Sequence, residues 1–115
     1  MPFHLPNNVR SEEAEQKIRA VRTDSHQYTL WDALLGQLWT PKGASSLAEM
    51  VSEQLRSADG VGAQSVRAGD IVLDSGANIG VFARMAFHLG ADKIIAVEHS
   101  SENLECFRRN FASEL

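Results

Sequence analysis

The chain has 115 residues, which fits one small domain, and its 43% hydrophobic and 23% charged content is typical of a globular protein. The formal net charge is −4 and the eleven lysines and arginines are scattered, so we expect neither nucleic acid nor an anionic membrane as a partner. No apolar run approaches the roughly 20 residues that span a bilayer. The N-terminus lacks the pattern of a signal peptide, so the expected location is the cytoplasm.

Cys106 is the only cysteine, which excludes an intramolecular disulfide. It lies in a segment of helical periodicity, where a lone cysteine is most often a small apolar residue. The nearest histidine in the sequence is His99, which is weak support for a nucleophile. We therefore expect Cys106 to be partly buried and unreactive, and we expect no metal site.

The N-terminal part begins with an irregular arm over residues 1–10, which carry two prolines and an Asn-Asn pair. Ser11 predicts the start of a helix that runs to about Arg22, with acidic residues in its first turn. The apolar positions of this helix are sparse. They are Ala14, Ile18 and Val21.

Residues 28–31 and 37–40 have strand-like composition, and residues 32–36 are suited to a turn, which predicts a hairpin. Leucines at helical spacing in the same stretch also fit a helix, but Gly36 interrupts it and tryptophans stand near both ends. We therefore favour the hairpin. We expect Trp31 and Trp39 to cover one edge of the core rather than to line a ligand pocket.

A capping box at Ser46 and Glu49 predicts a helix that runs to about Ala58. Its apolar stripe consists of Leu47, Met50, Val51 and Leu55. Residues 59–62 then end it. We interpret residues 1–62 as a lead-in of helices and a possible hairpin.

Residues 63–115 predict the start of a nucleotide-binding domain. An apolar strand from Ile71 to Leu73 or Asp74, expected to be buried on both faces, leads through a glycine loop into a helix closed by Gly90. A second strand over residues 93–98 leads to a helix capped by Ser100 or Ser101. The predicted fold class is α/β, with the first βαβα unit of a Rossmann-like fold.

The loop itself suggests its ligand. Gly76 and Gly80 lack side chains, so a ligand is able to lie against the backbone where the helix begins. Asp74 before the loop suits an ammonium or sulfonium group, and Glu98 lies where an acidic side chain accepts ribose hydroxyls. Together they predict an adenosine with a cationic tail, such as S-adenosylmethionine.

Three other interpretations of this loop are a dinucleotide site, a phosphate loop and a purely structural turn. A dinucleotide site needs a Gly-x-Gly-x-x-Gly fingerprint, but Ala77-Asn78 follows Gly76 and Val81 occupies the place of the third glycine. A phosphate loop needs a lysine after Gly80, which the chain lacks. In the third alternative, Asp74 and Glu98 only cap the ends of strands.

Residues 69–82, GDIVLDSGANIGVF, resemble the first motif of the FkbM family of methyltransferases. The similarity continues through residues 90–91, 96–104 and 108–111, so it covers residues 66–112 well and residues 30–41 more loosely. The family usually has proline after the ribose-binding glutamate, where this chain has His99. We expect only local differences in the loop from that departure.

The resemblance implies a class I fold with S-adenosylmethionine as methyl donor, usually for O-methylation, here of a small-molecule or sugar hydroxyl. It implies that the methionine end is held by the loop residues Asp74, Gly76, Ala77, Asn78 and Gly80, and the ribose by Glu98. Such domains have about seven strands and this chain supplies two. We therefore expect the N-terminal piece of a methyltransferase, without turnover on its own.

No residue is predicted to be catalytic. His26, His88 and His99 are interpreted as loop or helix-surface residues. The oligomeric state is left open.

Overall fold

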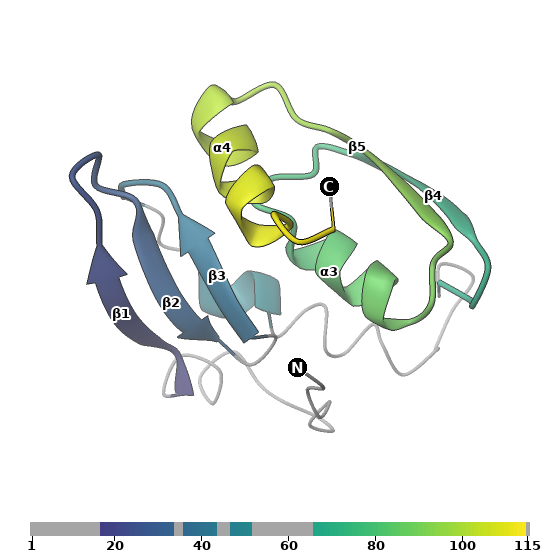
Figure 1. Ribbon diagram of the computed structural model, residues 1–115, viewed down its shortest axis with the longest axis horizontal. Coiled ribbons are helices and arrows are strands. Elements are labelled where there is room, and N and C mark those ends of the chain that lie inside the picture. The colour runs from purple at the N-terminus through teal and green to yellow at the C-terminus, as the bar shows by residue number, and fades with distance from the viewer. Residues whose placement is uncertain (1–16, 34–35, 44–46, 52–65, 115) are drawn as a thin grey trace.

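A computed structural model describes residues 17–33, 36–43, 47–51 and 66–114, and Figure 1 shows their arrangement. The described elements form two sheets. An antiparallel sheet of strand order β1-β2-β3 lies beside a parallel β4-β5 pair, with two helices between them (Figure 1). The chain is therefore a mixed α/β domain. None of its described helices is long and apolar enough to cross a membrane.

The predicted hairpin is confirmed. Strand β2 (Thr29–Ala33) pairs with β3 (Gly36–Thr40) from Thr29 opposite Thr40 to Ala33 opposite Gly36. Trp31 and Trp39 both pack against the core, as expected for tryptophans that cover its edge. The indole Nε1 of Trp31 also donates to the Thr40 hydroxyl at 2.8 Å, which satisfies its polar atom.

The helix expected through Arg22 is wrong over its described C-terminal part, because residues Arg19–Thr23 form strand β1. This strand is antiparallel to β2, with an irregularity between Ala20 and Arg22. The physical reason is that the sparse apolar positions gave a helix no face to bury, whereas pairing with β2 satisfies the backbone. The expected start of this helix at Ser11, like the arm before it, lies outside the described residues.

The helix predicted from the capping box is described only over residues 47–51, which are helical. Leu47 and Val51 are buried there and Met50 packs against the same core, as the apolar stripe indicates. Ser46 and residues 52–62 lie outside the described residues, so the cap and the end of this helix stay predictions.

The βαβα unit is confirmed in its elements. Strand β4 (Ile71–Ser75) pairs in parallel with β5 (Lys93–Val97), from Ile71 opposite Lys93 to Ser75 opposite Val97. Helix α3 (Val81–His88) connects them, and Gly90 follows it with φ of 97°, a conformation that favours glycine. Helix α4 (Ser101–Asn110) is capped by Ser100, whose hydroxyl accepts from the Asn103 N–H at 3.3 Å.

The expectation that β4 is buried on both faces is wrong. Helices α3 and α4 both lie on one side of the β4-β5 pair (Figure 1). On the opposite face the exposed fraction is 71% for Ile71, 69% for Leu73, 45% for Ile95 and 54% for Val97. The apolar composition of the strand correctly indicated two apolar faces, but no described element covers the face opposite to the helices.

The main core joins the lead-in to the βαβα unit. Leu38, Leu47 and Val51 pack there with Ile79, Val81, Met85 and Cys106. Cys106 is fully buried, and burial raises the pKa of its thiol to about 11, so it is a core residue and not a nucleophile. Leu38, Leu47 and Val51 precede the predicted boundary near residue 62, and the other four residues follow it. The parts of the chain before and after this boundary therefore share one core.

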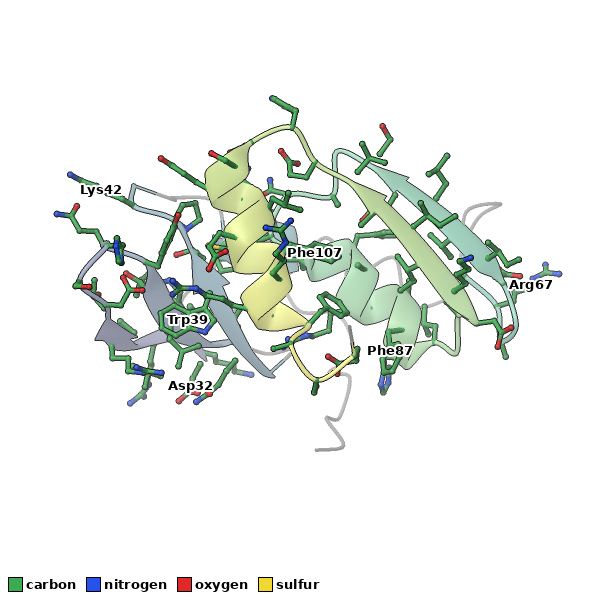
Figure 2. All side chains as sticks on the ribbon, turned by 45° about the horizontal axis from the view of Figure 1, so that its top comes forward. Asp32, Trp39, Lys42, Arg67, Phe87 and Phe107 are labelled. Atoms are coloured by element: carbon green, nitrogen blue, oxygen red, sulfur yellow. The ribbon has the colours of Figure 1, made fainter. Side chains whose placement is uncertain are left out.

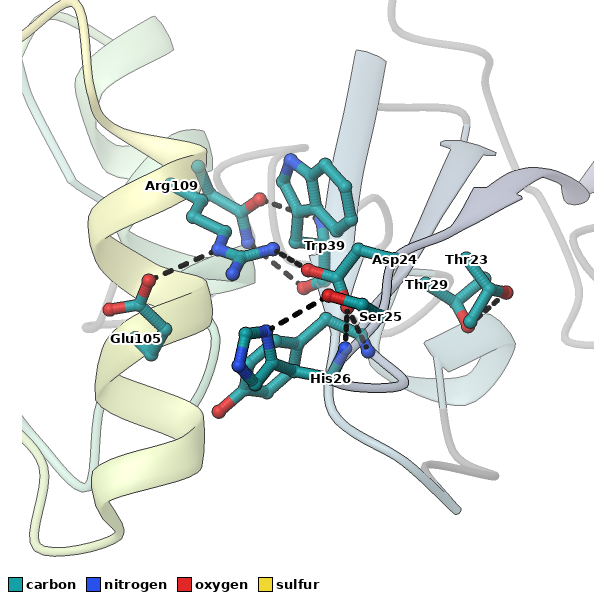
Figure 3. A network of polar contacts seen from close by, with 10 residues as sticks. Thr23, Asp24, Ser25, His26, Thr29, Trp39, Glu105 and Arg109 are labelled. Carbon is teal, nitrogen blue, oxygen red and sulfur yellow. Dashed lines mark hydrogen bonds and ion pairs between the residues drawn. The ribbon is translucent and has the colours of Figure 1, made fainter.

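Polar contacts tie α4 to the antiparallel sheet (Figure 3). The guanidinium of Arg109 bridges the Asp24 and Glu105 carboxylates, at 2.7 and 3.1 Å, and stacks on Tyr28 and Trp39. Asp24 in turn accepts the backbone N–H groups of the β1-β2 turn. The turn and the helix are therefore held together by one charged network.

Candidate functional site

The loop between β4 and α3 has a backbone that requires special residues. Gly76, Asn78 and Gly80 have φ of 75°, 54° and 97°, in the left-handed region that glycine and asparagine tolerate best. The N–H groups of Gly76 and Ala77 both donate to the carbonyl of Val97, at 2.8 and 2.9 Å. The loop is thus tied to the carboxyl end of the neighbouring strand β5.

A cavity of about 170 Å³ opens beside this loop. Four of the predicted site residues line it, namely Asp74, Gly76, Ala77 and Asn78, together with Val81, Phe82 and Met50. The contributions of Val81, Phe82 and Met50 were not predicted, and Met50 was assigned only to the apolar stripe of its own helix. Phe82 lies two positions after the loop, which was a usable signal, whereas nothing local in the sequence brings Met50 to this cavity.

Asp74 is the electrostatic centre of the cavity. Its Oδ2 atom is buried and has no hydrogen-bond partner in the described part of the chain. Burial raises the pKa of Asp74 above its usual value, and the nearby negative charge of Glu98 raises it further. A cationic group in the cavity would supply the missing partner, because none of the other described residues that line it carries a positive charge.

The two glycines of the loop have different roles. A Cβ on Gly76 would meet no atom within 4 Å, so its open side is available to a ligand. A Cβ on Gly80 would lie 2.8 Å from Cε2 of Phe111 and 3.0 Å from Cδ2 of Phe107. Phe107 lies where α4 meets α3 (Figure 2). The space beside the Gly80 Cα is therefore filled by these two aromatic rings, and the expected contact of Gly80 with a ligand stays a prediction.

Glu98 is brought to the loop, but it faces the backbone. Its side chain is only 5% exposed. Oε1 accepts the Asn78 N–H at 2.8 Å and Oε2 accepts the Ser100 N–H at 2.9 Å. The Ser100 hydrogen bond is the main cause of a lowered pKa at Glu98, and the Asn78 hydrogen bond adds to it. The carboxylate that was expected to bind a ribose is thus already hydrogen-bonded to backbone N–H groups of the protein.

The loop is a poor cradle for phosphate. The N–H groups of Gly76, Ala77 and Asn78 all donate within the chain, two to Val97 and one to Glu98. A pyrophosphate site needs such groups aimed at the ligand, and it has no use for a buried carboxylate beside them. The geometry thus favours a cation over an anion, which agrees with the missing dinucleotide fingerprint.

The other chemistry-bearing residues lie elsewhere. None of the histidines in the described ranges lines the cavity, and the side chain of His99 is almost fully exposed. Within the described ranges no group of three or more His, Cys, Asp or Glu residues is placed to hold a metal ion. A larger hollow of about 460 Å³ lies along β5 between α3 and α4. It is lined mainly by apolar side chains and includes no loop residue, so it is not the candidate site.

No family model matches the chain, so the FkbM resemblance is not confirmed, and no curated protein matches it. One similar solved structure is described as a "putative RNA methyltransferase PH1948" from Pyrococcus horikoshii, with 23% identity and a TM-score of 0.48. The match covers 91% of this chain and 45% of that one, so this chain spans less than half of that protein's length.

The expectation that nucleic acid is excluded as a partner is contradicted by this finding, since the description of the similar structure names RNA. The exclusion depended on a net charge of −4 and scattered basic residues. Local charge at a contact surface, rather than net charge, governs binding to nucleic acid, so that inference was too strong.

Proposed function

We propose that the loop of residues 74–78 binds the amino-acid end of S-adenosylmethionine, as the cofactor part of a methyltransferase. The observation that carries the proposal is the buried, unpartnered Oδ2 of Asp74 in the cavity at this loop. S-adenosylmethionine brings two cationic groups, an ammonium and a sulfonium, and its sulfonium supplies a methyl group to a nucleophile.

The chain's own residues account for binding and orientation. Asp74 would pair with a cationic group, and the open side of Gly76 would let the ligand lie against the backbone. Ala77, Asn78 and Phe82 would line the remainder. Sites for whole drug-sized ligands have about 300–1,000 Å³, so 170 Å³ suits the amino-acid end and leaves the nucleoside outside the cavity.

The proposal rests on the residues of the loop and on the FkbM resemblance, which implies O-methylation of a small-molecule or sugar hydroxyl. Among the described residues that line the cavity, Asp74 is the only one with a titratable side chain. No general base is assigned, and the acceptor is assigned to no described residue.

Calorimetry with S-adenosylmethionine, S-adenosylhomocysteine and NAD tests the proposal. We expect both adenosyl ligands to bind more tightly than NAD. In Asp74→Asn, affinity for the adenosyl ligands should fall by roughly tenfold or more, because a charge-assisted contact is lost. The matched control is Asp92→Asn, an exposed carboxylate at the opposite end of the β4-β5 pair, which should bind like the original chain. Tighter binding of NAD, or equal affinities in the two variants, would refute the proposal.

A second candidate is a binding module without catalysis. It is favoured by the cavity, because Asp74 is the only described lining residue that is able to exchange a proton. A methyl-transfer assay with radiolabelled donor separates the two candidates if it offers both hydroxylated small molecules and RNA. We expect the 115-residue chain to bind donor without turnover, and transfer to any of these acceptors would refute that expectation.

A further inference from the structure

The buried carboxylate of Glu98 connects three parts of the molecule, namely the end of β5, the glycine loop and the start of α4. One oxygen accepts the N–H of Asn78 in the loop and the other accepts the N–H of Ser100. Ser100 is itself the N-cap of α4. Since both oxygens lie against backbone donors and the side chain is 5% exposed, Glu98 presents little surface to a ligand.

The Glu98 carboxylate affects the cavity through Asn78, whose N–H it accepts. Asn78 is one of two described residues other than glycine with a positive φ, at 54°, and it lines the cavity beside Asp74. The left-handed conformation is unfavourable for a residue with a side chain unless its surroundings hold it. A hydrogen bond from the Asn78 N–H to an ionised carboxylate is the strong kind, and it fixes this peptide.

We propose that Glu98 is a positioning residue, which holds Asn78 in its left-handed conformation and so keeps the loop shaped around the cation-binding carboxylate of Asp74. It acts on the ligand through the loop and not through direct contact with a ribose. This inference rests on the proposed function, since it assigns a role at the same site.

The test compares a ligand that has a ribose with one that lacks it. S-adenosylmethionine and S-methyl-L-methionine share the sulfonium and the amino-acid end, but only the first carries the nucleoside. Dissociation constants are measured by NMR titration for the original chain and for Glu98→Gln. We expect the substitution to weaken both ligands by the same factor, about tenfold, because a charge-assisted hydrogen bond to the loop is lost.

Two results overturn the inference in distinguishable ways. If Glu98→Gln weakens S-adenosylmethionine and leaves S-methyl-L-methionine unchanged, Glu98 binds the ribose directly and the positioning role is wrong. If the original chain binds neither ligand, the proposed function itself fails and the inference fails with it.

A second substitution separates positioning from loss of charge. Glycine adopts a positive φ without strain, so Asn78→Gly should relieve the need for Glu98. In the Asn78→Gly background we expect Glu98→Gln to change S-methyl-L-methionine affinity by less than about twofold. If Glu98→Gln alone fails to fold, the double variant still allows the effect of Glu98→Gln on ligand affinity to be measured. A loss of about tenfold in that background would indicate that Glu98 acts through its charge, which overturns the inference.

Discussion

Two carboxylates that look equivalent in the sequence have opposite environments. The Oδ2 atom of Asp74 is buried and has no hydrogen-bond partner among the described residues, and the pKa of Asp74 is raised. Glu98 accepts two backbone hydrogen bonds, and its pKa is lowered. At neutral pH the charge on Glu98 is therefore compensated and stabilises its loop, whereas the charge on Asp74 is held at a cost. Such a cost is common where a residue is kept for binding.

The cost at Asp74 predicts the pH dependence of stability. Because the folded-state pKa lies above the ordinary 3.8, the native state holds this proton more tightly than the unfolded chain does. The stabilisation by protonated Asp74 is complete below 3.8 and is lost as the pH rises through the folded pKa. Asp74→Asn should therefore be at least as stable as the original chain at pH 7, with a difference that disappears in acid.

Urea denaturation across a pH series measures this difference. The exposed Asp92→Asn should shift stability by less than about 0.5 kcal/mol at every pH. A loss of stability in Asp74→Asn at pH 7 would show that the carboxylate has a stabilising partner.

The two loop glycines give a matched pair of substitutions. Both have a positive φ, so alanine is strained at either position, by about 1–3 kcal/mol. At Gly80 the new Cβ also collides with Phe107 and Phe111, which adds about 1–3 kcal/mol of overpacking. We expect Gly80→Ala to lower the free energy of unfolding more than Gly76→Ala does, as measured by urea denaturation. Equal losses would contradict the assigned role of Gly80.

At the scale of elements, Asn110 at the end of α4 joins three segments. Its Nδ2 donates to the carbonyls of Ile79 and Trp39, at 2.8 and 3.3 Å, and its Oδ1 accepts the Trp39 N–H at 2.7 Å. A single buried amide thus connects the glycine loop, strand β3 and helix α4. This connection explains how the antiparallel sheet supports a loop that is distant in the sequence.

Asn110→Ala should therefore be costly. It leaves backbone groups of Trp39 and Ile79 without partners, and each such buried group costs about 1–3 kcal/mol. We expect a loss of about 2–4 kcal/mol in the free energy of unfolding. The control is Gln37→Ala, whose exposed side chain donates to the Asp32 carboxylate at the sheet surface and should cost about 0.5 kcal/mol or less. Similar losses in both variants would rule out the bridging role.

At the scale of the whole molecule, the β4-β5 pair has one covered face and one bare face. Ile71, Leu73, Ile95 and Val97 expose apolar side chains together on the bare face. Exposed apolar patches of this kind favour association with other apolar surfaces. The four side chains contribute little to the stability of the chain as it stands, because burial is what makes an apolar group stabilising.

Two identical leucine truncations check this difference. Leu73→Ala, on the bare face, should change the free energy of unfolding by about 0.5 kcal/mol or less and reduce fluorescence of a bound apolar dye. Leu38→Ala, in the main core at 0% exposure, should cost about 2–5 kcal/mol and leave dye binding by the folded state unchanged. A large loss of stability in Leu73→Ala would mean that the bare face is covered in solution.

Local sequence information was sufficient for several features. The hairpin followed from turn residues between two strand-like runs, and the βαβα unit followed from apolar periodicity with its glycines and serine cap. The loop from Asp74 to Gly80 was recognised because two glycines follow an apolar strand and precede a helix. These features depend on interactions between near neighbours in the chain, which composition and spacing record directly.

Only the tertiary structure decided the remainder, since it depends on contacts between distant segments. Pairing with β2 made residues 19–23 a strand, although their own pattern suggested a helix. Packing of Phe107 and Phe111 assigned Gly80 to the fold, and the hydrogen bonds of Asn78 and Ser100 turned Glu98 toward the backbone. The sequence by itself determined which groups gather at the loop. Burial and long-range hydrogen bonds determined that, within the described ranges, the Oδ2 atom of Asp74 is left without a partner.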